Sequence, residues 1–145
     1  MRLLDLKPWH IPLRVASGAF ILQSGLSKRG MEGEAAEGLH EFAAAGHPEV
    51  KPVEPEIFAK GLSTTEIVLG SALLLPVVPS WLAAAGLTAF AAGLNRLYFK
   101  APGLRQEGDI RPTEEGMGIA KDVWMTAMGV AMLIDAVSDR LSGRL

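Results

Sequence analysis

The longest apolar stretch of the chain, residues 67–95, contains 29 consecutive residues without a charge. An uncharged run of about 18 residues is already long enough for a membrane-spanning helix. Pro76 and Pro79 interrupt this run, and proline ends or kinks a helix because it lacks an N–H donor and clashes with the preceding turn. The pattern therefore predicts two helices joined by a tight turn, at about residues 57–77 and 81–99.

Two further apolar segments flank this pair, at residues 11–28 and 117–137. At about 1.5 Å per residue, each can cross roughly 30 Å of hydrocarbon once its flanks are included. None of the four segments alternates apolar and polar residues with the period of two that strands show. The sequence therefore predicts an all-α protein of four long helices in up-down-up-down order, with both termini at one end.

A soluble four-helix bundle is the alternative to a membrane protein. Each helix of a soluble bundle carries a polar stripe that faces water. Residues 81–94 contain only Thr88 as a polar position, and residues 67–78 contain only Ser71. Because these helices are apolar on all sides, we expect an integral membrane four-helix bundle. We expect it to form a single domain over residues 1–145 and to lie as a multi-pass protein in the inner (plasma) membrane.

The first loop, by contrast, is acidic and has helical spacing over residues 31–46. Ala35, Leu39 and Phe42 fall on one face of such a helix, and the opposite face carries Glu34, Glu37 and Glu41. We therefore expect a short interfacial helix with an acidic outer face. A partly ordered surface loop is the alternative, because Gly33 and Gly38 weaken a helix.

Composition excludes several classes of chemistry. The chain has no cysteine, which excludes disulfides, thiol redox chemistry and cysteine-ligated metal clusters. A net charge of −2 gives no attraction to phosphate, so we expect no nucleic-acid partner. His40 and His47 lack a fixed carboxylate beside them and make a poor metal site, so we expect no metal.

No residue pattern of a known catalytic site is visible in the sequence. There is no Gly-rich phosphate loop and no Ser/His/Asp constellation, which favours a protein without autonomous enzymatic activity. One alternative is a quinone-reactive enzyme subunit that uses Glu66 or Asp122 as proton acceptor. Another is a small-solute transporter, which would need a water-filled path near the helix breaks at Pro76 and Pro79.

Polar and charged residues within the predicted spans form the candidate site. Such residues cost roughly 2.5–3.5 kcal/mol each to insert and usually face the bundle interior and pair with one another. Seven of them can converge below the first and third loops: Gln23, Lys28, Glu66, Asn95, Arg96, Lys121 and Asp122. They predict either a polar pocket that binds a quinone-like or small anionic head group, or a buried ion-pair network that fixes helix register.

Small residues recur every four positions on the predicted third helix, at Ala85, Ala89 and Gly93. Such stripes allow helices to approach closely in lipid. They indicate packing inside the bundle or contact with another membrane-protein subunit.

Several motifs along the chain resemble the DoxX family of small four-helix membrane proteins. The first helix is similar to that family in the spacing of Arg14, Gly18, Phe20, Gly25 and Lys28. The loop segment 42–48, Glu66 four residues before Gly70, and the pair Lys121-Asp122 follow in the family's order.

The resemblance implies a four-helix membrane fold and a redox-linked accessory role, since the family is named after a subunit associated with thiosulfate:quinone oxidoreduction. We therefore expect an accessory subunit of a larger redox or respiratory membrane complex, bound to other membrane-protein subunits and to lipid. The alternative is a membrane protein that binds a quinone or a small anion in a polar pocket around Glu66. We expect no cofactor unless that quinone is one.

Overall fold

The computed structural model describes residues 6–143 and is helical throughout. Its elements are α1 (His10–Ser27), α2 (Gly33–Gly46), the short 3-10 helix η1 (Pro48–Val50), α3 (Pro55–Leu74), α4 (Ser80–Lys100), α5 (Met117–Ala120) and α6 (Val123–Leu141). Residues 6–143 contain no strand, and a single β-bridge joins Arg105 to Pro112 in the loop after α4. The all-α prediction is confirmed.

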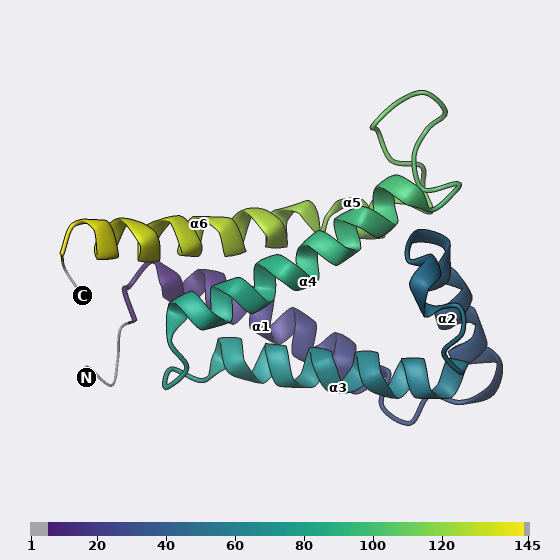
Figure 1. The fold of residues 1–145 in the computed structure, drawn as a ribbon, viewed down its shortest axis with the longest axis horizontal. Coiled ribbons are helices and arrows are strands. Elements are labelled where there is room, and N and C mark those ends of the chain that lie inside the picture. The colour runs from purple at the N-terminus through teal and green to yellow at the C-terminus, as the bar shows by residue number, and fades with distance from the viewer. Residues whose placement is uncertain (1–5, 144–145) are drawn as a thin grey trace.

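The four long helices run back and forth along the molecule (Figure 1). The start of α1 and the end of α6 lie at one end, which we call the terminal end, and the loops before α3 and after α4 lie at the opposite end, the loop end. Contacts concentrate in two pairs, α1 with α3 and α4 with α6, and α1 touches α6 at few points. Helix α2 lies across the loop end, where it contacts both α3 and α4.

Proline and polar residues set the helix ends. Helix α3 ends at Leu74, two residues before Pro76, and α4 begins directly after Pro79, as the restriction on residues next to proline requires. The helix expected at 117–137 is divided into α5 and α6 by a break at Lys121-Asp122, and α6 continues to Leu141. A helix is present in the first loop as α2, close to the bounds of 31–46 that the sequence predicts.

Glycines bring α1 and α3 into close contact. A Cβ atom added to Gly70 would lie 2.6 Å from the backbone nitrogen of Leu22, and one added to Gly25 would lie 2.8 Å from that of Ile67. Neither distance is possible for a real side chain without a shift of the backbone. Gly25 and Gly70 therefore let α1 and α3 pack closely, whereas a Cβ atom added to Gly93 of the predicted stripe on α4 would meet no other atom within 4 Å.

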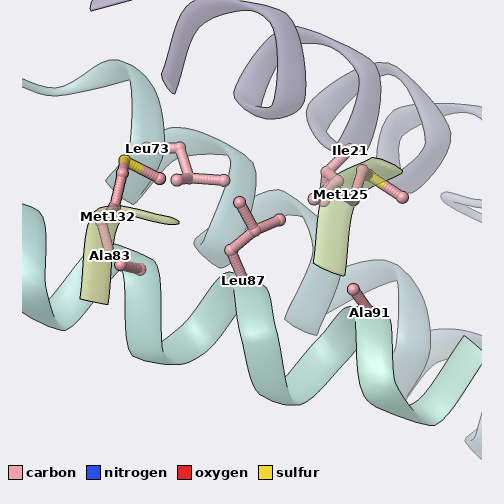
Figure 2. Close-up of a cluster of buried hydrophobic side chains, with 8 residues drawn as sticks. Ile21, Leu73, Ala83, Leu87, Ala91, Met125 and Met132 are labelled. Carbon is pink, nitrogen blue, oxygen red and sulfur yellow. The ribbon is translucent and has the colours of Figure 1, made fainter. Parts of the chain in front are cut away.

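The hydrophobic core lies where the two helix pairs meet. Ile21, Leu73, Leu87 and Met132 are each no more than 1% exposed. Figure 2 shows Leu87 pointing from α4 toward the side chains of the other helices, with Met125 and Met132 of α6 on either side. Alanines at 83, 84 and 91 complete the α4 face.

Two helical segments are long and apolar enough to cross a membrane, α3 and the stretch Met117–Leu141. Only 28% and 22% of their apolar windows, respectively, are buried inside the protein.

Candidate ligand-binding cavity

A cavity of about 620 Å³ lies at the loop end, between α2 and the long helices. We call it the loop-end cavity. Four of the protein's five phenylalanines line it, each from a different helix: Phe20, Phe42, Phe58 and Phe90. The remaining lining is mostly aliphatic, with polar atoms from Ser24, Lys28, His47, Glu66 and Asp122. Cavities of several hundred Å³ with apolar walls and a few converging polar groups are typical of small-molecule sites.

Lys28 and Glu66 form an ion pair in the cavity wall. The Nζ of Lys28 lies 3.0 Å from Oε2 and 3.3 Å from Oε1 of Glu66, and it also donates to the Oγ of Ser24 at 2.6 Å. Ser24 and Lys28 are four residues apart, which places them on one face of α1. Only 5% of the Glu66 side chain and 17% of the Lys28 side chain are exposed. The three N–H groups of Lys28 thus have partners in Ser24 and Glu66, while the carboxylate oxygens of Glu66 keep the capacity to accept a further hydrogen bond from the cavity.

Gly25 allows this pair to form. Its missing side chain lets α1 approach α3, because a Cβ atom there would lie 2.9 Å from the Cβ of Glu66. Ser63 adds a hydrogen bond across the same contact, from its hydroxyl to the carbonyl oxygen of Gly25 at 2.8 Å. The ion pair thus lies beside a close contact between α1 and α3.

Asp122 is the second buried carboxyl group of the cavity, after Glu66. It is 8% exposed and occupies the N-cap position of α6 without a capping hydrogen bond from its side chain. Among residues 6–143 its carboxyl group makes no hydrogen bond or ion pair. A buried carboxyl group without a partner is unfavourable for the fold alone, so Asp122 is the group in this cavity with most hydrogen-bonding capacity left for a ligand.

His47 lies at the rim of the cavity, just after α2. Its Nε2 is 2.8 Å from the carbonyl oxygen of Gly93, and its Nδ1 is 3.3 Å from Oε1 of Glu49. A carbonyl oxygen only accepts hydrogen bonds, so Nε2 is the donor. The residue therefore fastens the end of α2 to α4.

The other four predicted site residues lie elsewhere. Gln23 is exposed on α1, because it is one position and therefore about 100° around the helix from Ser24. Lys121 is exposed in the break between α5 and α6. Asn95 donates from Nδ2 to the Oγ1 of Thr126 at 2.7 Å, which links α4 to α6. The structure thus brings Lys28, Glu66 and Asp122 to one cavity and leaves the remaining predicted residues outside it.

Arg96 also points away from the cavity. It pairs with Glu49 of η1 through two hydrogen bonds, of 2.6 and 3.2 Å. The pKa of Glu49 is lowered to about 2, chiefly by a hydrogen bond from its own backbone N–H, with smaller contributions from Arg96 and His47. This pair closes the loop end beside His47 and does not face a ligand.

Sequence reasoning missed the role of Arg14. This side chain is 2% exposed at the terminal end, and its three nitrogens donate five hydrogen bonds. The acceptors are the carbonyl oxygens of Ala72, Leu73, Leu75 and Val78 and the hydroxyl of Ser80. The last carbonyl oxygens of a helix have no hydrogen-bond donor within that helix. The sequence does contain a signal for this role, because α3 ends in an apolar turn before Pro76 that offers no side-chain donor of its own.

A second polar cluster at the terminal end was likewise not predicted. Asp135 of α6 lies 2.7 Å from both the Nζ of Lys7 and the Nε2 of His10, and Lys7 also pairs with Asp139. The cluster fastens the start of α1 to α6. It lies at the opposite end of the long helices from the loop-end cavity (Figure 1).

Comparison of the chain with protein-family models, with curated proteins and with solved structures finds no match. The DoxX resemblance therefore stays a prediction from the residues. Residues 6–143 hold no group of three or more side chains that could bind a metal ion.

Proposed function

We propose that the protein is an integral membrane protein in which α1, α3, α4 and α6 cross the inner membrane as a bundle of the DoxX type. The low burial of the two most apolar segments supports this, because a core helix of a soluble protein would be mostly buried. Large apolar side chains are also exposed along all four helices, among them Phe20, Val68, Trp81 and Ile134. Such a surface is stable against lipid and costly against water.

We further propose that the loop-end cavity binds a lipid-soluble molecule with a flat, conjugated ring that carries oxygen atoms, of the quinone type. The observation that carries this proposal is the joint presence of four phenylalanine rings, two buried carboxyl groups and the partly buried Lys28 around one cavity. Phenylalanine rings stack on flat conjugated rings or meet them edge to face. Glu66 and Asp122 can accept a hydrogen bond from a ring hydroxyl, and Lys28 can donate to a ring oxygen in exchange for one of its hydrogen bonds to Ser24.

We also propose a second function, which the sequence favours: the protein serves as an accessory subunit of a larger redox or respiratory membrane complex. The exposed acidic residues of α2, Glu34, Glu37 and Glu41, support it, since they offer a negatively charged surface outside the membrane to a partner with basic groups. In this proposal the protein holds a quinone-like molecule within a larger redox or respiratory complex. The two functions are compatible, because the acidic surface and the cavity use different residues.

The test of the cavity uses a cavity-filling variant and a matched control on the same helix. Ala89 lines the cavity, whereas Ala92, also exposed on α4, lines none of the cavities found. Purified protein in mild detergent is titrated with a short-tail benzoquinone, and quenching of tryptophan fluorescence reports binding. We expect saturable binding by the wild type and by Ala92→Phe, and at least about tenfold weaker binding by Ala89→Phe.

Two results would refute this function. One is the absence of saturable binding by the wild-type protein. The other is equal affinity of all three proteins, which would place the quinone outside the cavity.

Mass spectrometry of the complex extracted in the same detergent tests the accessory role, since co-purified oxidoreductase subunits would support it and a lone protein would count against it.

A further inference from the structure

A second, smaller hollow of about 240 Å³ lies on the side of the protein, between α1 and α6. We call it the side opening. It is mostly apolar and is lined from α1, from the break before α6 and from α6 itself, by Ala16, Ser17, Phe20, Lys121, Asp122, Trp124, Met125 and Met128. It lies where the two helix pairs have few contacts, because α1 packs mainly on α3 and α6 mainly on α4.

The side opening and the loop-end cavity share three residues: Phe20, Asp122 and Met125. The two hollows are therefore separated by side chains and not by a helix backbone. Phe20 is 62% exposed, so its ring has room to rotate outward. Side chains that are this exposed change rotamer on the nanosecond timescale.

The loop end of the cavity is closed by comparison. Helix α2 lies across it (Figure 1), and a Cβ atom on Gly46 would lie 2.6 Å from the Cα of Leu97, which shows how closely the end of α2 approaches α4. The hydrogen bond from His47 to Gly93 and the Arg96–Glu49 pair fasten the same corner. A ligand that entered at this corner would have to displace these contacts.

We propose that the side opening is the path by which the ligand reaches the loop-end cavity from the surrounding lipid. Phe20 is the gate of this path, and Asp122 is the polar group that the ligand's ring meets between the two hollows. This inference rests on the proposed function, and it adds the path and the residues that control it. An apolar path at the flank of the molecule suits a lipid-soluble ligand, since the tail can stay in lipid while the ring enters.

The experiment compares binding rates in variants with a narrowed or widened path. Ala16 lines the side opening and not the loop-end cavity, so Ala16→Phe adds bulk to the path without touching the bound ligand. Phe20→Ala removes the gate, and Ala92→Phe is the matched control for added bulk on an exposed helix position. Stopped-flow quenching by a short-tail benzoquinone is recorded from Trp124, which lines the side opening.

We expect Ala16→Phe to slow association and dissociation together by about tenfold, with the equilibrium dissociation constant unchanged, because a barrier on the path affects both directions equally. Phe20→Ala should accelerate association, and Ala92→Phe should match the wild type. Circular dichroism confirms that each variant is folded. Association rates that are the same in all four proteins would refute the path while leaving the cavity intact, whereas the absence of wild-type binding would refute the proposed function itself.

Discussion

The Nε of Arg14 in α1 lies 2.8 Å from the carbonyl oxygen of Leu73 in the last turn of α3. The Arg14 side chain thereby caps the C-terminal end of α3. Its other nitrogens also donate to the turn that leads to α4. A guanidinium group suits this position because its five N–H groups are fixed in a plane and can serve several carbonyl oxygens at once.

Replacement of Arg14 by methionine should destabilise the protein by about 3 kcal/mol or more, because buried carbonyl oxygens at the end of α3 lose their donors. Arg14→Lys should recover part of the loss, since an ammonium group has three donors where the guanidinium uses five. Unfolding by denaturant in detergent micelles measures both, with Arg29→Met at an exposed position as control. Equal stability of Arg14→Met and Arg29→Met would contradict this role.

The Lys28–Glu66 pair should behave as a unit. Lys28→Met or Glu66→Gln alone leaves one buried group without its partner and should cost about 3–5 kcal/mol of stability. The double variant Lys28→Met/Glu66→Leu should regain most of that loss, because it leaves no buried charge behind. A double-mutant cycle on the free energies of unfolding measures the coupling, and additive losses would show that the two residues act independently.

The positions of the helices could be predicted because they follow from apolar runs and prolines, which are local signals. The tight turn at Pro76 and Pro79 and the helix over 31–46 were predicted within a few residues of α2, α3 and α4. The break at Lys121-Asp122 was not predicted, because a helix tolerates both lysine and aspartate. No local sequence signal therefore marks the point where α5 ends and α6 begins.

The candidate site could be predicted only in part, for a geometric reason. Lys28, Glu66 and Asp122 reach one cavity, but depth along a helix does not determine which way a side chain points. Gln23 and Arg96 lie at suitable depths and point elsewhere. The cavity itself arises from α2, whose packing over the loop end depends on the close contact of Gly46 with Leu97, which no local pattern indicates.

Acid should release the corner of the loop end that Glu49 holds. Its pKa of about 2 lies below the ordinary glutamate pKa of 4.5, so the ionised form stabilises the folded corner. That stabilisation is complete above about pH 4.5 and is lost as the pH falls toward 2. Hydrogen exchange of the α2 and η1 amides should therefore accelerate over this range in the wild type. In Glu49→Gln the exchange should already be faster at neutral pH and depend less on acid, and identical profiles for the two proteins would rule out the proposed role of this pair.

Asp122 should contribute to ligand choice at a cost in stability. Its carboxyl group is buried and has no partner among residues 6–143, so Asp122→Leu removes a polar group that the fold does not use and should raise the melting temperature by about 2–8 °C. The same variant should lose preference for a reduced ring, because a carboxylate accepts a hydrogen bond from a hydroxyl group and repels a carbonyl oxygen.

The measurement is the ratio of affinities for a short-tail benzohydroquinone and the matching benzoquinone, with the hydroquinone kept reduced under argon. We expect this ratio to fall by about tenfold in Asp122→Leu, since charge-assisted hydrogen bonds are worth roughly 1.5–3 kcal/mol. Glu114→Leu removes an exposed carboxylate that lines none of the cavities, and it should leave both the ratio and the melting temperature as in the wild type. A lower melting temperature in Asp122→Leu would mean that the carboxyl group has a structural partner. An unchanged affinity ratio would mean that the ligand's ring does not reach Asp122, and the ring would then have to be placed nearer to Lys28 and Glu66.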